Sequence, residues 1–118
     1  MKNLTVAVLL FILAACNSYS LNKQVETDRK KPVLKYSPVS EYPTSAAKKG
    51  IGGWVKLKFD VNEKGRPVNI VVLDSKPLKT FDKVAKKTLS NWRYLPKVVN
   101  GIPVVAQKLE TTLTFSLN

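Results

Sequence analysis

The stretch GWVKLKFDVNEKGRPVNIVVLD, residues 53–74, decides the fold of this 118-residue chain. Its first part, residues 53–61, alternates apolar and polar side chains, which is typical of a half-buried β-strand. The NEKGR segment that follows contains Gly65 and predicts a turn. The last part, residues 68–74, is rich in β-branched side chains and nearly continuously apolar, so it predicts a second strand. Pro67 fits the start of that strand, because proline cannot donate to the ladder. We therefore expect a β-hairpin here.

An amphipathic helix is expected next, in KTFDKVAKKTLSNW, residues 79–92. Its apolar positions recur at helical spacing and form one stripe. The stripe consists of Phe81, Val84, Ala85, Thr88, Leu89 and Trp92. Thr80 is the expected N-cap. Trp92 closes the stripe and is therefore interpreted as a core residue, with the lysines of this segment on the opposite, solvated side.

The remaining periodic segments complete an α+β order. YPTSAAKKG, residues 42–50, has proline at its start and glycine at its end, which predicts a short helix. NG at residues 100–101 predicts a turn. AQKLETTLTFSL, residues 106–117, alternates as a strand, with Leu109, Thr111, Leu113, Phe115 and Leu117 expected inward and Ala106, Lys108, Glu110, Thr112 and Thr114 outward. The order helix, strand, strand, helix, strand predicts a small antiparallel sheet covered on one face.

Composition argues against several classes of site. The chain has one cysteine and no histidine, so a zinc site is not expected, and neither is a cofactor. There is no Ser–His or Cys–His set and no glycine-rich phosphate cradle, and the carboxylates are scattered over expected turns and wet faces. We therefore predict a protein that is not an enzyme.

The formal charge of +12 predicts attraction to polyanions. Nucleic-acid stacking platforms need exposed aromatic side chains interleaved with cations. Here the aromatics of the WRYLP segment, residues 92–96, follow the apolar stripe, whereas the lysines lie on the far face. A nucleic-acid partner is therefore not expected.

The first residues predict export. Lys2 precedes a run from Leu4 to Ala15 that is apolar except for Thr5. Twelve helical residues rise only about 18 Å, too little for a hydrocarbon core of about 30 Å. A short positive start, a short apolar run and small residues at its end indicate a cleavable signal over residues 1–15.

The LAAC sequence that ends this run resembles a bacterial lipobox. That resemblance implies that the thiol of Cys16 takes a diacylglycerol, that the signal is cut before it, and that the new amino group is acylated, for example with palmitate. The alternatives are an ordinary signal with a chance cysteine and a short membrane anchor. Asn17 in the next position favours the outer membrane. Residues 16–40 are polar and lack a hydrophobic period, so they predict a lipidated flexible tether before a domain at 41–118.

The spaced anchors of the domain resemble the C-terminal domain of the TonB family of energy-transducing periplasmic proteins. These anchors are Tyr42-Pro43, Gly53, Val55, FDVNEKGR, Phe81 and WRYLP. The resemblance implies a TonB C-terminal-like, three-stranded antiparallel sheet with two helices on one face. It also implies that the last strand lies at the sheet edge and captures an extended segment of an outer-membrane transporter by β-augmentation. The candidate peptide-binding residues are Ala106, Lys108, Glu110, Thr112 and Thr114.

The family's energy transducers have an uncleaved membrane helix with a histidine and a long proline-rich linker, which this chain does not match. We therefore expect a periplasm-facing lipoprotein that binds an extended peptide of a transporter or other envelope protein and is associated with TonB-dependent transmembrane transport. The alternative is a structural envelope protein held by its basic surface to anionic lipid or cell-wall polymer.

Overall fold

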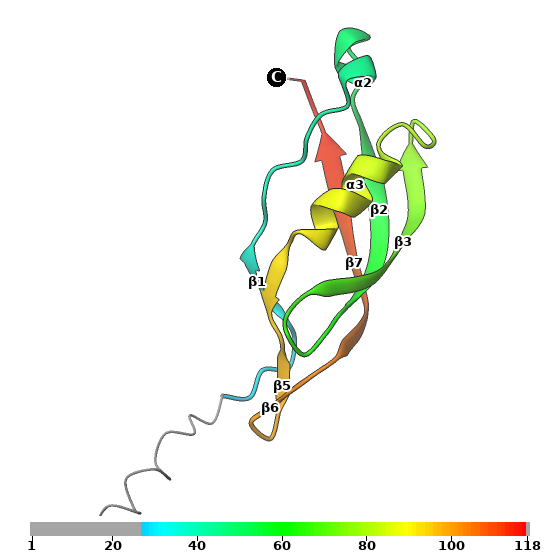
Figure 1. Cartoon of the computed structure of the whole chain (residues 1–118). Helices are drawn as coiled ribbons and strands as arrows, with labels where there is room; N and C mark the ends of the chain where they lie inside the picture. Colours follow the sequence, from blue (N-terminus) through cyan, green and yellow to red (C-terminus); the bar gives the residue numbers. More distant parts are fainter. Residues whose placement is uncertain (1–26, 118) are drawn as a thin grey trace, which may run out of the picture.

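The computed structural model of this protein describes residues 27–117 (Figure 1). The predicted signal of residues 1–15, Cys16 and the first part of the predicted tether lie outside the described residues. Within the described part, none of the helices has the length and apolar character needed to span a membrane.

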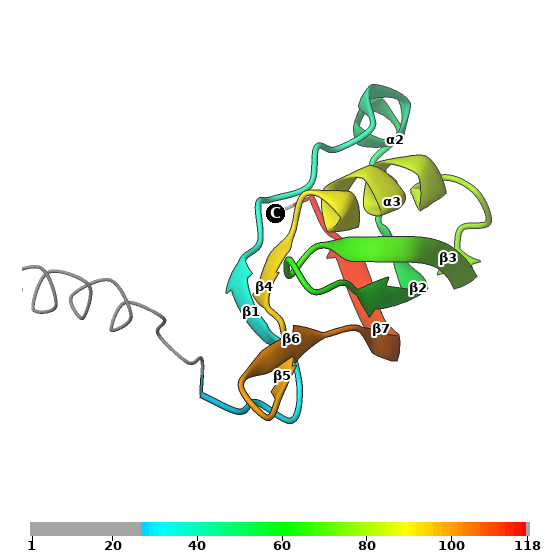
Figure 2. The same ribbon diagram turned by 60° about the horizontal axis from the view of Figure 1, so that its bottom comes forward.

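Three long strands form one antiparallel sheet. These are β2 (Gly53–Val61), β3 (Pro67–Lys76) and β7 (Ala106–Phe115), in the order β3-β2-β7 with β2 in the centre. Helix α3 (Asp82–Ser90) lies across one face of this sheet, and α2 (Thr44–Lys48) lies beyond one end on the same side (Figure 2). The predicted α+β fold, with its three-stranded sheet and two helices on one face, is confirmed.

The core lies between the sheet and α3. The side chains predicted to face inward from β2 are at most 2% exposed: Val55, Leu57, Phe59 and Val61. The apolar stripe of α3 meets them with Phe81, Ala85 and Leu89, all fully buried. Phe81 stacks on Phe115 of β7 with ring centroids 4.4 Å apart, which links the start of the helix to the edge strand. The periodicity in the sequence thus identified the packed faces of both elements.

Helix α3 begins later than the sequence predicts. Thr80 was expected as its N-cap, but the N-cap residue is Phe81, and no side chain caps the helix. The first backbone hydrogen bond of the helix runs from the Ala85 N–H to the Phe81 carbonyl, at 2.9 Å. Asp82 then supplies a negative charge at the positive end of the helix dipole.

The WRYLP segment packs as a core-covering connection. Trp92 and Tyr94 are half-buried against the core, with their ring centroids 6.4 Å apart, and Tyr94 also lies 5.9 Å from Phe59. Burial raises the pKa of the Tyr94 phenol above its ordinary value. Trp92 therefore packs against the core as predicted, but it is only half-buried and lies just beyond the end of α3.

Gly65 joins the β2–β3 turn to the WRYLP segment. It has φ +78°, and its carbonyl accepts the backbone N–H of Tyr94 at 2.8 Å. A Cβ atom at residue 65 would lie 1.8 Å from the carbonyl oxygen of Tyr94. The turn therefore requires glycine both for its left-handed backbone and for the close approach.

Part of the predicted tether is folded. Strand β1 (Val33–Tyr36) pairs antiparallel with β4 (Arg93–Leu95), so the prediction of a flexible tether over all of residues 16–40 is wrong in this part. All four residues of β1 are exposed. The backbone ladder holds this strand without burying its side chains, so no hydrophobic period marked it in the sequence.

A second contact secures the segment before β1. Strands β5 (Lys97–Val99) and β6 (Ile102–Val104) form a hairpin whose tip is the predicted turn at residues 100–101. The carboxylate of Asp28 accepts the two backbone N–H groups of that turn, at 3.1 and 2.8 Å. The folded unit therefore begins well before residue 41.

Candidate peptide-binding edge

Strand β7 forms a long edge of the three-stranded sheet. Seven consecutive residue pairs, from Gly53↔Phe115 to Phe59↔Leu109, join it to β2 without a shift in register. Among residues 27–117, no other strand pairs with β7. Its outer side therefore presents backbone N–H and C=O groups in a regular row, which is the arrangement that accepts an added strand.

A β-bulge at Lys108 ends this regular row. Lys108 has φ +60°, and its backbone N–H donates to the Asp60 carboxylate at 3.0 Å. The other oxygen of Asp60 accepts a hydrogen bond from the Asn69 side-chain amide at 3.0 Å. Asn69 also has a left-handed backbone, with φ +53°. Asp60 of the central strand thus stabilises irregular backbone in both of its neighbours.

These contacts make the stability of the fold depend on the ionisation of the Asp60 carboxyl. The amide of Asn69, followed by the backbone N–H of Lys108, holds the pKa of the Asp60 carboxyl below its ordinary value of 3.8. Because the pKa of Asp60 is lower in the folded state, its ionised carboxylate stabilises the fold at pH values above 3.8. This stabilisation is lost as the pH falls through the folded-state pKa.

We expect Asp60→Asn to lower the free energy of unfolding at neutral pH, because the charge that strengthens both hydrogen bonds is lost. The difference between the parent chain and the variant should shrink as the pH falls below 3.8, since the parent then also becomes neutral at Asp60. Urea unfolding at a series of pH values measures this. A difference that is constant with pH would contradict the role of the ionised carboxylate.

Four of the predicted peptide-binding residues are exposed along β7. Lys108 lies at the bulge, and Glu110, Thr112 and Thr114 follow on the face of the sheet away from the helices. Thr114 pairs with Trp54, and Thr112 pairs with Lys56. Glu110 lies 3.6 Å from the Lys56 ammonium, but both side chains are about half exposed, so this ion pair contributes little stability.

The predicted outward position of Ala106 is wrong. Ala106 is only 7% exposed and pairs with Val61, on the core side. Between Phe59 and Val61 the chain of β2 advances two residues, whereas β7 advances three, from Leu109 to Ala106. The extra residue of the bulge changes the face to which Ala106 belongs. Leu117, expected inward, lies beyond the end of β7 and is 45% exposed.

The structure adds two residues to this edge that the alternation assigned to the core. Leu109 and Thr111 are half-buried on the helix side, so an added strand would contact them there. No sequence signal separated them from the fully packed Leu113 and Phe115. At the buried end of the strand, Phe115 packs against the rings of Phe81 and Tyr42.

The other edge of the sheet is less regular. Strand β3 shifts register against β2 twice, between Lys56 and Leu57 and between Lys58 and Asp60. Each bulge twists the strand and shortens the run that an added strand could follow. The described residues also contain no group of three or more metal-ligating side chains. The long regular edge of β7 is therefore the candidate site that the geometry favours.

Comparison with known proteins agrees with this fold. Residues 38–117 match the family model described as Gram-negative bacterial TonB protein C-terminal. Protein TonB of Pseudomonas aeruginosa is 38% identical over 77 residues, which are 65% of this chain and 22% of that protein. Protein TonB of Escherichia coli is 42% identical over 65 residues, which are 54% of this chain and 27% of that protein. The chain thus matches about a quarter of the length of these relatives.

Two solved structures have the same fold. The solution structure of the Pseudomonas aeruginosa TonB C-terminal domain superposes with a TM-score of 0.62 at 28% identity, covering 82% of this chain and 91% of that one. The TonB2 protein of Vibrio anguillarum superposes with a TM-score of 0.56 at 26% identity, covering 84% of this chain and 93% of that one.

Proposed function

Because the chain belongs to the Gram-negative bacterial TonB C-terminal family, we propose that it binds an extended peptide segment of an outer-membrane transporter or another envelope protein along the outer edge of β7. The observation that supports this most directly is the unbroken run of seven residue pairs behind that edge. A binding domain that is not an enzyme is consistent with the family match.

The proposed binding is strand addition. The peptide backbone bonds to the outward N–H and C=O groups of alternate residues between Leu109 and Phe115, and its side chains then lie on both faces of the sheet. On the open face they contact Glu110, Thr112 and Thr114, with Lys108 at the bulged end. Ala106 contributes only backbone at the start of the strand, since its side chain is buried.

We propose that the domain lies in the periplasm and is attached to a membrane through acyl chains on Cys16. The outer membrane is the favoured one. The LAAC sequence supports this anchor, and more than one acyl chain gives stable attachment. The chain would thereby take part in TonB-dependent transport as a tethered binding module.

The basic surface supports a second candidate, contact with anionic lipid or cell-wall polymer. Lys79, Lys83 and Lys87 line a depression of about 490 Å³ beside α3, together with Glu41. Three ammonium groups around a partly apolar depression suit an anionic head group. This contact would hold the domain close to the membrane surface and leave the edge of β7 open to a peptide.

To test strand addition, we expect Thr112→Pro in the intact chain to abolish binding of synthetic peptides that cover the periplasmic segments of outer-membrane transporters. Proline removes a backbone donor and obstructs an added strand. Thr112→Val is the matched control, because it keeps the backbone N–H and the β-branched shape, and it should bind as the parent does. Isothermal titration calorimetry measures affinity, and circular dichroism checks the fold.

A second measurement leaves the protein unchanged. A bound peptide that is resynthesised with N-methyl groups on alternate residues loses its outward donors, so one of the two methylation patterns should eliminate binding. Two results together would refute strand addition at β7. A folded Thr112→Pro variant would still bind the peptide, and the parent chain would bind the peptides with either methylation pattern.

A further inference from the structure

The β5–β6 hairpin presents exposed apolar side chains at one end of the domain. Val99 and Ile102 pair with each other next to its turn, so they lie on the same face, and they are 43% and 63% exposed. Val98 alternates with Val99 and therefore faces the other way, where it is only 2% exposed. The hairpin thus has one face packed on the domain and one apolar face in solvent.

A basic depression of about 490 Å³ adjoins this hairpin. Its lining consists of Asp28, Arg29, Lys30, Lys97, Val98 and Val99. The carboxylate of Asp28 accepts the two backbone N–H groups of the turn at residues 100–101, so it is already engaged within the fold. The depression therefore offers three cationic groups beside apolar side chains, and we call Lys30, Lys97, Val99 and Ile102 the hairpin patch.

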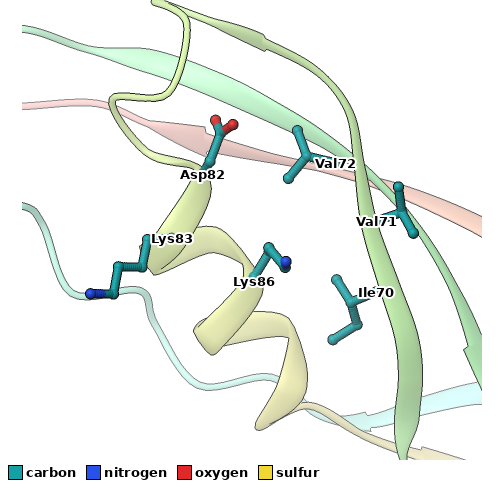
Figure 3. Close-up of a pocket in the computed structure, with 6 residues that line it drawn as sticks. All are labelled: Ile70, Val71, Val72, Asp82, Lys83 and Lys86. Carbon is teal, nitrogen blue, oxygen red and sulfur yellow. The ribbon is translucent and has the colours of Figure 1, made fainter.

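The depression between β3 and α3 has a different charge pattern (Figure 3). It has a volume of about 540 Å³, and Asp82, Lys83 and Lys86 line it from α3. One carboxylate oxygen of Asp82 is buried and has no hydrogen-bond partner among residues 27–117. A carboxylate without hydrogen-bond donors opposes the binding of an anion. The depression beside the hairpin is therefore the better site for an anionic group.

The polypeptide enters the folded part beside the hairpin. The backbone N–H and C=O groups of Arg29 both bond to Val98, at 2.9 Å each. In Figure 1 the start of the described chain lies next to the hairpin, whereas α2 lies at the opposite end of the domain. Thr27 follows Cys16 by 11 residues, which span at most about 40 Å even when fully extended. A lipid anchor on Cys16 would therefore keep this end of the domain close to the bilayer.

We propose that the hairpin patch docks on the surface of an anionic phospholipid bilayer, an inference that rests on the attachment proposed for Cys16. Val99 and Ile102 enter the interface between head groups and acyl chains. Lys30 and Lys97 bind the phosphate groups around them. Cell-wall polymer fits this patch less well, because a hydrated polymer offers no apolar medium in which the two aliphatic side chains are buried.

This contact would orient the peptide-binding edge. Strand β7 begins at Ala106, two residues after the end of β6 at Val104, so its start lies near the bilayer and its Phe115 end points away (Figure 1). The depression lined by Lys79, Lys83 and Lys87 lies beside α3 and the segment before α2, at the other end of the domain. The two basic depressions are therefore alternative membrane contacts, and they predict opposite orientations.

Fluorescent labelling tests which end meets the membrane. Residues 17–118 contain every described residue and lack both Cys16 and the apolar run, which would itself enter bilayers. We expect a nitrobenzoxadiazole label on Ile102→Cys to brighten and shift to shorter wavelength with vesicles of equal parts phosphatidylglycerol and phosphatidylcholine, because the dye leaves water. The matched control is Leu78→Cys, an exposed aliphatic position, 78%, just before α3, whose label should not respond.

Charge removal tests the head-group contact. In co-sedimentation of the same chain with these vesicles, Lys30→Gln combined with Lys97→Gln should weaken partitioning by about fivefold for each charge removed. Lys83→Gln combined with Lys87→Gln removes the same charge from the other depression. This control should weaken partitioning by less than about twofold, because charges further from the bilayer than about 8 Å are screened at physiological ionic strength. Circular dichroism checks that both variants are folded.

Four results would each overturn docking through the hairpin patch. These are an equal response of the two labels, an equal or larger loss from the control pair, partitioning that is as strong on pure phosphatidylcholine, and retention on purified cell wall with none on the vesicles. Failure of the other proposals is seen separately. Residues 17–118 carry no acyl chain, so the vesicle results do not depend on Cys16, and peptide titration without vesicles measures β7 alone.

Discussion

Gly65→Ala should lower the free energy of unfolding by about 2–5 kcal/mol, one of the two largest effects expected in this protein. About 1–2 kcal/mol of this comes from placing an L side chain in the left-handed region. The remainder, about 1–3 kcal/mol, comes from overpacking. The new Cβ atom would lie 1.8 Å from the carbonyl oxygen of Tyr94, and backbone on both sides must move to relieve the contact.

Gly50→Ala separates these two contributions. Gly50 has φ +66°, similar to the +78° of Gly65, but no atom lies within 4 Å of its ideal Cβ position. We expect this control to lose only the backbone contribution, about 1–2 kcal/mol. Urea unfolding of both variants, followed by tryptophan fluorescence, measures the difference. Equal destabilisation would show that the contact between the β2–β3 turn and the WRYLP segment contributes little.

Phe81→Ala should lower the free energy of unfolding by about 3–5 kcal/mol, the usual cost of deleting a buried aromatic ring. The Phe81 ring is fully buried, stacks on Phe115 and meets the Tyr42 ring edge-on at 5.5 Å. It therefore joins α3, the edge strand β7 and the segment before α2. Its loss should also reduce peptide binding, because β7 would no longer be held against the helix.

Leu78→Ala is the control for this deletion. Leu78 is three residues earlier in the chain and 78% exposed, so its truncation should change stability by no more than about 0.5 kcal/mol. Amide hydrogen exchange then tests the link to β7, since Phe81→Ala should accelerate exchange in Leu113 and Phe115 more than in the β5–β6 hairpin. Uniform acceleration over the whole domain would argue against a specific connection between Phe81 and the edge.

Periodicity predicted the sheet and the main helix because burial on one face imposes it. The inward side chains of β2 had to be apolar at every second position, and the α3 stripe had to recur at helical spacing. The turns at Gly65 and at residues 100–101 were also predictable, since few residue types adopt left-handed backbone. A predicted edge position for the last strand was confirmed by the sheet order.

Other features left no such imprint on the sequence. Strand β1 is held by backbone hydrogen bonds and exposes all its side chains, so it resembled a tether. Thr80 has the side chain of an N-cap, but the N-cap residue is Phe81 and no side chain caps the helix. The sequence alone therefore determined which faces are apolar and where the chain turns, because solvent exclusion and backbone sterics act on each residue locally. The bulge that buries Ala106 and the regular length of the β7 edge were decided only by the tertiary structure, because they depend on the register between β2 and β7, which are distant in the chain.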